Sequence, residues 1–519
     1  MDLRDIVNRI PEHSAQNRVT TIERGKIVQR SFAELKDAVG EAVTKLQGCG
    51  VIQGMRIGIR ANNSYAWMVH ELALLHLRAI SVSFTADFDG TTNEDLCAKY
   101  DLGLMLVDVR EPGCVSHKVL TFAEASSKAQ AMEGAISQDE GFERPGLIFS
   151  SGSAGGIKGM VLNRRGIEAS VEAFVNAMRP DPNDRLLIFL PMSNFQQRLM
   201  YYAALWYGFD LIIVEPKHLF KALQELSPSI VIGPPALYEA IENRVLALPP
   251  LTRRLAISLG AAAKFLPTEG LRRMAARAIF AKVHQTLGGN IRFMITGMAP
   301  IRLSTLKIFA TMGLPLFETY GLIESGSVAL NVPGGNRLGS VGKPLPGVRV
   351  SLANDNEIIV SRDHPIAVGY FQCAEGENER TFVDGGVATG DIGRFDKDGF
   401  LYLVGRKKEI IVTGGGEKIH PAMLEAEIGT CPDIERAVVV PKQSGLGLAA
   451  IVCLRNPNDT KAKHRVEEFI ENLNGKWRNV SIDSVIFTEE PFSLENNFLR
   501  PNLKLDRNRI SEHFRSLVG

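Results

Sequence analysis

The stretch between residues 149 and 159 constrains the fold of this chain more than any other. It reads FSSGSAGGIKG and lies between two short apolar runs, residues 146–149 and 160–162. This order predicts a strand, a tight loop and a second strand. Glycines let backbone N–H groups approach a ligand closely, and successive N–H groups form a concavity for anions. Lys158 adds a charge that suits phosphate. The loop therefore predicts a polyphosphate-binding turn.

The loop is not a Walker A motif. That motif places Ser or Thr after its lysine, whereas Gly159 follows Lys158 here. A Gly/Ser hairpin without any ligand is the alternative, because such loops are common. The loop alone leaves both interpretations open, so other motifs have to decide between them.

Composition sets broad limits on the protein. A chain of 519 residues is too long for one core and predicts two to four domains, and 45% hydrophobic with 23% charged residues is typical of a folded soluble protein. A net charge of +1 gives no electrostatic reason to expect nucleic acid as a partner. Six scattered cysteines without a C-x-x-C pair predict buried thiols in a reducing compartment.

The sequence also bears on location. Residues 1–5 do not resemble a signal peptide, and no run of about 18 apolar residues occurs. We therefore expect a cytoplasmic protein without a transmembrane segment, for which peripheral membrane contact stays open. The mostly helical region 240–290 is basic, and a solvated helical face is the favoured interpretation over a membrane or partner surface.

Helix and strand patterns alternate along the first half of the chain. Residues 32–47 carry apolar side chains at helical spacing, and residues 55–59 and 79–83 are strand-like. Phe195–Tyr207 is a further predicted helix. This alternation predicts an α/β fold with layered helices and sheets.

Several motifs together resemble the adenylate-forming superfamily. The loop at 149–159 resembles the signature [Tyr/Phe]-[Thr/Ser]-Ser-Gly-Thr-Thr-Gly-x-Pro-Lys-Gly, with Ala154 in place of a hydroxyl residue and Ile157 in place of proline. Residues 317–324, FETYGLIE, resemble the Tyr-Gly-x-Thr-Glu motif, and residues 389–391 match Thr-Gly-Asp. Residues 399–421 are the longest match, and they resemble the Gly-Arg-Lys-Lys-Glu-Ile-Ile-Val-Thr segment of the long-chain acyl-CoA synthetases nearly residue for residue. The motifs keep the family order over almost the whole chain.

This resemblance implies a domain organisation. We expect a large ATP- and substrate-binding adenylation domain at residues 1–404 and a mobile α+β lid domain at residues 405–519. Lys408 is the implied hinge, since a rotating lid needs a few residues that absorb the change in φ and ψ.

The resemblance also implies an activity. ATP and a small-molecule carboxylic acid would give acyl-AMP with release of pyrophosphate, and the acyl group would then pass to a thiol, with coenzyme A as the expected acceptor. Two alternatives are an acyl-AMP ligase that loads a carrier protein and an enzyme of specialised metabolism that activates a non-fatty substrate, nitrite included. A non-catalytic binding protein is disfavoured, because the chain keeps Lys158, Glu324, Asp391, Arg406 and Lys504.

The resemblance assigns roles to individual residues. Tyr320 would stack on adenine, Glu324 would hold Mg²⁺, Asp391 would accept bonds from the ribose hydroxyls, and Lys504 would reach the α-phosphate and the carboxylate. The expected catalytic residues are Lys504, Glu324, Asn194 and Lys158. The expected nucleotide-binding residues are Ser150, Ser151, Gly152, Ser153, Ala154, Gly155, Lys158, Gly297, Met298, Ala299, Glu318, Thr319, Tyr320, Gly321, Ile323, Asp391, Arg406 and Lys408.

Besides Ala154, three departures from the family pattern fall in this set. Asn194 replaces a histidine beside the carboxylate and the thiol entrance, Ile323 replaces a threonine, and Met298 replaces a glycine. Asparagine can form hydrogen bonds but takes up no proton at neutral pH. We therefore expect an altered acid, acceptor or second half-reaction.

Overall fold

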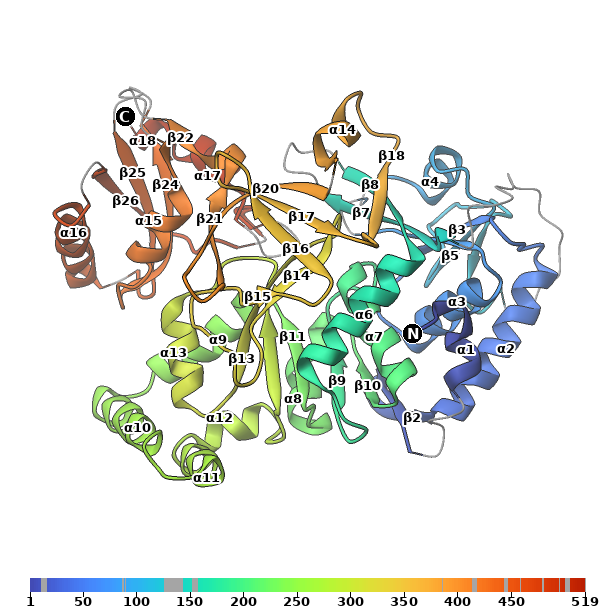
Figure 1. Cartoon of the computed structure of the whole chain (residues 1–519), viewed down its shortest axis with the longest axis horizontal. Helices are drawn as coiled ribbons and strands as arrows, with labels where there is room; N and C mark the ends of the chain where they lie inside the picture. The colour runs from blue at the N-terminus through green and yellow to red at the C-terminus, as the bar shows by residue number, and fades with distance from the viewer. Residues whose placement is uncertain are drawn as a thin grey trace.

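The fold was analysed in a computed structural model (Figure 1). Of residues 150, 151 and 418 it describes the backbone alone. The described residues are 1–10, 16–85, 88, 90–125, 143–151, 157–384, 386–412, 418–442, 447–457, 459–477, 480–493, 495–499 and 505–518.

A seven-stranded sheet carries the glycine-rich loop. Its strand order is β18-β8-β7-β4-β3-β5-β6, and β7 and β8 pair antiparallel, with Ser150 opposite Lys158. The predicted strand–loop–strand is thus present, although residues 152–156 at its tip lie outside the described residues. The strands are β3 (Arg56–Arg60), β4 (Ile80–Ser83), β5 (Leu104–Val107), β6 (Val119–Thr121), β7 (Gly146–Ser151), β8 (Ile157–Leu162) and β18 (Ala367–Phe371).

A nine-stranded sheet forms the second large layer. Its order is β15-β14-β13-β12-β11-β9-β10-β1-β2, and the pairings from β1 to β13 are parallel. The strands are β1 (Arg18–Glu23), β2 (Lys26–Ser31), β9 (Arg185–Ile188), β10 (Asp210–Ile213), β11 (Ile230–Gly233), β12 (Phe293–Thr296), β13 (Leu316–Leu322), β14 (Gly326–Leu330) and β15 (Lys343–Pro344).

The main core joins these two sheets through helices that lie between them (Figure 1). The helix Phe32–Gly48 starts at a capping box, in which Ser31 and Glu34 bond each other's backbone N–H groups. Another begins after Asn194 and ends before Gly208, as predicted. The helices are α1 (Ile6–Arg9), α2 (Phe32–Gly48), α3 (Tyr65–His76), α6 (Arg164–Met178) and α7 (Phe195–Tyr207), preceded by the 3-10 turn η1 (Leu3–Asp5).

A second core covers the other face of the nine-stranded sheet. It includes buried side chains of α8, α9 and α13. The elements on and around this face are η4 (Pro216–His218), α8 (Leu219–Leu226), α9 (Pro235–Leu246), α10 (Pro250–Ala263), α11 (Glu269–Ile279), α12 (Ala281–Thr286) and α13 (Leu303–Thr311); α4 (Asn93–Lys99) lies beside the seven-stranded sheet.

A five-stranded sheet leads into the C-terminal part. It has the order β16-β17-β20-β19, and β21 also pairs with β20. Its strands are β16 (Val348–Leu352), β17 (Glu357–Arg362), β19 (Phe382–Val383), β20 (Gly386–Phe395) and β21 (Leu401–Arg406). The helix α14 (Glu377–Thr381) comes directly before β19, and η5 (Lys407–Glu409) follows β21.

The C-terminal part has its own three-stranded sheet, with buried clusters that are separate from the main core. The α/β expectation, with a large first part and a smaller C-terminal part, is confirmed, whereas the domain boundary after residue 404 stays a prediction. The elements are β22 (Ile411–Val412), β23 (Lys418–Ile419), α15 (Pro421–Ile428), β24 (Ile434–Pro441), β25 (Leu448–Leu454), α16 (Thr460–Asn474), β26 (Ile482–Thr488), α17 (Arg507–His513) and α18 (Arg515–Val518).

Two further expectations can be compared with the structure. Within the described residues, no helix is both long and apolar enough to cross a membrane. All six cysteines are free, and four are buried as expected, but Cys114 and Cys373 are only half-buried.

Candidate active site

Lys158 of the glycine-rich loop lies in a cluster of polar side chains. Its Nζ atom is 4.7 Å from the ring centre of Tyr370 and forms an ion pair with Glu377 of α14. The Tyr370 hydroxyl donates a hydrogen bond of 2.9 Å to Oε1 of Glu324. Burial, and then the charge of Glu324, raises the pKa of Tyr370 well above its usual value, so this hydroxyl stays a donor. The cluster thus brings a lysine, a carboxylate and a fixed donor together.

Strand pairing explains this convergence. β18 pairs antiparallel with β8, and Tyr370 is opposite Met160, two residues beyond Lys158. Gly159 permits the close approach, because a Cβ atom there would lie 3.2 Å from the ring of Phe149 and 3.3 Å from Phe371. Glu324 comes from the turn between β13 and β14.

A second polar group forms where β13 meets β20. Tyr320 and Asp391 are both buried, and the Tyr320 hydroxyl donates a hydrogen bond of 2.8 Å to Oδ2 of Asp391. Asp391 and Arg406 are opposite each other on β20 and β21, and Arg406 Nε is 3.0 Å from Oδ1 of Asp391. Burial and the Asp391 charge raise the pKa of Tyr320 well above its usual value. The three predicted nucleotide residues therefore form one bonded set.

The neighbours of Tyr320 on β13 hold the strand in place. Glu318 accepts a hydrogen bond of 2.9 Å from the Gly339 N–H, and burial raises the pKa of Glu318 to about 8. The Thr319 hydroxyl donates to the carbonyl of Ala329 on β14. A side chain at Gly321 would meet the backbone of β14, 2.7 Å away, so this position requires glycine. Ile323 is half-buried and packs against the main core.

The turn after β12 contains the predicted residues Gly297, Met298 and Ala299. Met298 has φ +70°, a left-handed conformation that favours glycine, the usual family residue there. Asn194 caps α7, because its Oδ1 accepts a hydrogen bond of 3.2 Å from the Gln196 N–H. Its Nδ2 lies 3.9 Å from the Met298 sulfur. Two of the three departures from the family pattern are therefore in contact.

The C-terminal part docks on α9 and on the start of α13 through polar contacts. Arg302 bonds the carboxylate of buried Glu242 at 3.0 Å and the backbone carbonyl of Glu435 at 3.1 Å. Arg436 lies 3.8 Å from Glu239, and Arg455 donates to Asn243. Nothing in the sequence motifs pointed to these contacts.

Some of the predicted residues lie within the part of the chain that the structure describes, and others lie outside it. Lys408 lies in η5, directly after β21, and its neighbour Lys407 pairs with Glu357 and Asp355 at 2.6 Å each. Lys504 and residues 152–155, which are Gly152, Ser153, Ala154 and Gly155, lie outside the described residues. Ser150 and Ser151 are described only as backbone of β7.

The sequence missed Tyr370 and Glu377. Tyr370 belongs to no motif that we identified, and only the pairing of β18 with β8 brings it to Lys158. Glu377 lies on the short helix α14 and reaches Lys158 from a third segment. A single glutamate outside any motif does not reveal from the sequence that it will pair with a distant lysine.

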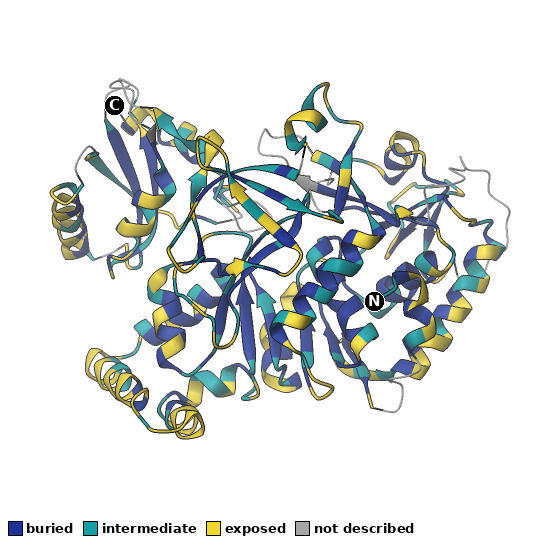
Figure 2. Cartoon of the chain, viewed as in Figure 1, coloured by how far each residue is buried: buried dark blue, intermediate teal, exposed yellow. Residues whose placement is uncertain are grey.

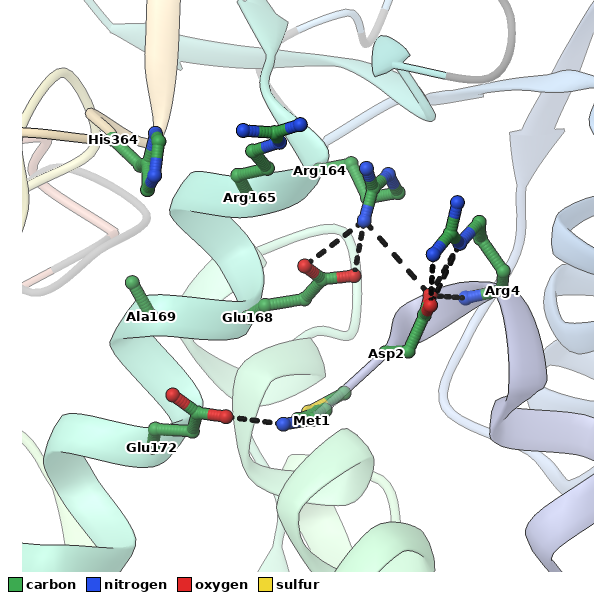
Figure 3. A pocket seen from close by; sticks show the side chains of 9 residues that line it. All are labelled: Met1, Asp2, Arg4, Arg164, Arg165, Glu168, Ala169, Glu172 and His364. Atoms are coloured by element: carbon green, nitrogen blue, oxygen red, sulfur yellow. Dashed lines mark hydrogen bonds and ion pairs between the residues drawn. The ribbon is translucent and has the colours of Figure 1, made fainter.

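A surface pocket beside the N-terminus contains none of the predicted residues (Figure 3). Several of its charges are paired within it: the N-terminal ammonium of Met1 bonds Glu172, and Asp2 bonds Arg4 and lies 3.8 Å from Arg164. These pairs attach the N-terminus to α6. In the described part of the chain, no three or more His, Cys, Asp or Glu side chains converge on a metal site.

Comparison with known proteins decides the family. A family model described as AMP-binding enzyme matches residues 8–369. The chain belongs to this family. The chain is 29% identical over 452 residues to the long-chain-fatty-acid–CoA ligase FadD15 of Mycobacterium bovis, and the alignment covers 79% of this chain and 74% of the relative. It is 26% identical over 440 residues to the long-chain-fatty-acid–CoA ligase ACSBG2 of Gallus gallus, covering 72% and 57%.

Solved structures share the fold of the AMP-binding enzyme. The anthranilate CoA ligase AuaEII in complex with anthranoyl-AMP superposes with a TM-score of 0.79 at 18% identity, covering 100% of this chain and 98% of the other. A Mycobacterium tuberculosis fatty acyl CoA synthetase gives a TM-score of 0.66 at 19% identity, covering 100% and 99%. Family and relatives together identify the chain as an ATP-dependent, AMP-forming ligase.

Proposed function

We propose that this ligase activates a fatty acid as its acyl-AMP and transfers the acyl group to coenzyme A. The observation that carries the proposal is the bonded set Tyr320–Asp391–Arg406 beside the Lys158–Tyr370–Glu324 cluster. The first offers an aromatic face and a carboxylate, and the second offers a cation and a carboxylate. The long-chain-fatty-acid–CoA ligases among the relatives support the choice of a fatty acid.

Binding of the nucleotide would use both groups. The Tyr320 ring would stack on adenine, and Asp391, kept in place by Tyr320 and Arg406, would accept hydrogen bonds from the ribose hydroxyls. Lys158 would leave Glu377 for the phosphates, since a phosphate carries more negative charge than one carboxylate. Lys504 would complete the charge neutralisation from the lid.

Glu324 is a suitable ligand for Mg²⁺. Mg²⁺ prefers oxygen ligands and is often held by one or two carboxylates together with substrate phosphates. Tyr370 donates to one carboxylate oxygen of Glu324, which fixes the orientation of the carboxylate. When bound, Mg²⁺ would neutralise charge on the phosphates. A carboxylate oxygen of the acid would then attack the α-phosphorus, and pyrophosphate would leave as the bond between the α-phosphorus and the bridging oxygen breaks. Positioning and electrostatics would be the main contributions of the protein.

An aromatic acid is the second candidate substrate. Asn194 and Met298 contact each other where the family has histidine and glycine. These two side chains would therefore alter the lining of the pocket in which we expect the acid to bind. The anthranilate CoA ligase also superposes with a higher TM-score than the fatty acyl CoA synthetase. Transfer to a carrier protein and activation of nitrite remain further alternatives for the same first step.

A pyrophosphate-release assay over a panel of acids tests the proposal. The panel contains fatty, aromatic and amino acids and nitrite, each with and without coenzyme A, with mass spectrometry of the products. We expect release with fatty acids and a thioester when coenzyme A is present. Asp391→Asn should abolish most of the signal, whereas Asp398→Asn on the exposed turn beyond β20 should leave it unchanged. Release with aromatic acids alone favours the second candidate, and an adenylate without thioester favours a carrier protein.

A further inference from the structure

The helices α10 and α11 with the loop between them project from the body of the molecule (Figure 1). We call residues 250–279 the α10–α11 hairpin. Most of its surface is exposed (Figure 2). The two helices contact each other, and α10 also contacts α13.

The hairpin exposes large apolar side chains. Phe265 in the connecting loop is 88% exposed, Leu251 is 82% exposed and Met274 is 70% exposed. On α10 the exposed leucines recur every four residues, which places them along one side of the helix. The exposed apolar set is Leu251, Leu255, Leu259, Phe265, Leu271 and Met274.

Small residues determine which side of α10 faces the body. A Cβ atom at Gly260 would lie 2.7 Å from the Phe280 ring and 2.8 Å from a Thr311 methyl group, so only glycine allows this contact. Ala263 is the other buried residue of the helix. Gly260 follows Leu251 by nine residues, or about two and a half helical turns, so the two residues lie on opposite sides of the helix. α10 therefore packs through its small residues and turns its leucines away, the reverse of an ordinary surface helix.

The hairpin is also strongly basic. It contains six basic residues and one acidic residue, a net charge of +5, in a chain whose total is +1. The rest of the chain is accordingly at −4. The one acidic side chain, Glu269, pairs with Arg273 inside the hairpin. The basic residues are Arg253, Arg254, Lys264, Arg272, Arg273 and Arg277.

We propose that the α10–α11 hairpin docks on an anionic lipid surface. Amphipathic helices that lie in the membrane interface combine apolar side chains in the acyl boundary with Lys and Arg at the lipid phosphates. Charge complementarity selects anionic lipid as the occupant, because each basic residue near such a surface adds to binding. Phe265 at the projecting loop is placed to enter the membrane first. The inference rests on the hairpin alone and is independent of the acid that the ligase activates.

Flotation of the full chain with lipid vesicles tests the proposal without any turnover. We expect binding to vesicles with about 30% phosphatidylglycerol, and at least about tenfold weaker binding to pure phosphatidylcholine. Salt at about 0.5 M should weaken the binding, because it screens charge beyond a few ångströms.

Two variants separate the hairpin from the rest of the surface. The triple variant Leu255→Ser/Phe265→Ser/Met274→Ser should lose at least about tenfold in vesicle binding, since three apolar side chains no longer enter the interface. The matched control Val109→Ser/Val115→Ser changes two highly exposed valines elsewhere and should bind as the wild type does. Equal thermal melting of both variants and wild type checks that the changes leave the fold intact.

Three results would overturn the proposal. The first is wild-type protein that stays unbound with anionic vesicles. The second is a triple variant that binds as well as wild type. The third is wild-type protein that sediments as a dimer without lipid and becomes monomeric in the triple variant, because the hairpin would then be an interface between two copies. Loss of ligase activity in any assay has no bearing on these outcomes.

Discussion

Substitution of Glu318 by glutamine should make the protein more stable at alkaline pH and leave its stability almost unchanged at about pH 4. Burial raises the pKa of Glu318 to about 8, from an ordinary value of 4.5. At pH values between 4.5 and about 8, the folded protein therefore keeps a proton on Glu318 that the unfolded chain has released. Stability falls with rising pH wherever the folded state binds more protons. This contribution is thus lost progressively from about pH 4.5 and fully lost above about pH 8.

The size of the effect follows from the shift. A difference of about 3.5 in pKa corresponds to about 5 kcal/mol at about 1.4 kcal/mol for each pKa unit. Glu318 is only half-buried, so solvent screening reduces the expected loss to about 2–3 kcal/mol. For a folded unit of about 400 residues, this changes the melting temperature by about 3 °C. Glutamine keeps an oxygen that can accept the Gly339 N–H, so the backbone contact survives.

Calorimetric melting of wild type and Glu318→Gln at about pH 4 and at about pH 9 measures the effect. The difference between the two proteins isolates Glu318, because every other titrating group is shared. We expect the two melting temperatures to agree at about pH 4, a partial gap at pH values between 4.5 and about 8, and the variant to melt about 3 °C higher at the alkaline pH. A gap that is the same at both pH values, or a variant that is less stable at alkaline pH, would refute the reasoning.

Three further predictions concern the proposed chemistry. Glu324→Gln should raise the Mg²⁺ concentration for half-maximal pyrophosphate release by about tenfold, because a neutral amide is a weaker ligand than a carboxylate; an unchanged Mg²⁺ dependence contradicts the metal role. Asp391→Asn should weaken ATP binding by about tenfold in calorimetric titration, and equal affinity would remove Asp391 from the ribose site. Lys504→Ala should slow adenylation by about 10²–10³ and spare thioester formation from supplied acyl-AMP. Lys408→Pro should do the reverse by fixing φ at the hinge, and impairment of the same half-reaction in both variants excludes a rotating lid.

Local signals in the sequence predicted much of the fold. The helix Phe195–Tyr207 has its bounds where the sequence placed them, because Asn194 caps its start and Gly208 takes a positive φ at its end. The strands on either side of the glycine-rich loop were also predicted from a local signal, because two short apolar runs flank the loop directly in the sequence. The pairing of β18 with β8 was not predictable, because about 200 residues separate the two strands and strand pairing leaves no local mark.

The residues of the candidate site also divide into those that a sequence motif predicted and those that only the tertiary structure shows. Asp391 and Arg406 belong to motifs, and the hairpin of β20 and β21 places them opposite each other. Tyr370 belongs to no motif, although its hydroxyl holds Glu324. The basic region at 240–290 was interpreted as a solvated face because charge is visible in the sequence. The side to which the α10 leucines point depends on the contact of Gly260 with Phe280, which only the tertiary structure shows.

The contact between Asn194 and Met298 bears on how the departures from the family pattern should be understood. Met298 keeps a left-handed backbone at φ +70°, which costs a residue other than glycine about 1–3 kcal/mol. The fold retains this strain while placing the Met298 sulfur 3.9 Å from the Asn194 amide. Asparagine at 194 is small, caps α7 and leaves room for the thioether beside it. A histidine introduced alone would meet that thioether, and a glycine introduced alone would leave space next to asparagine. The two positions therefore act as one unit, and we expect Asn194→His combined with Met298→Gly to change the substrate range by more than the two single effects together.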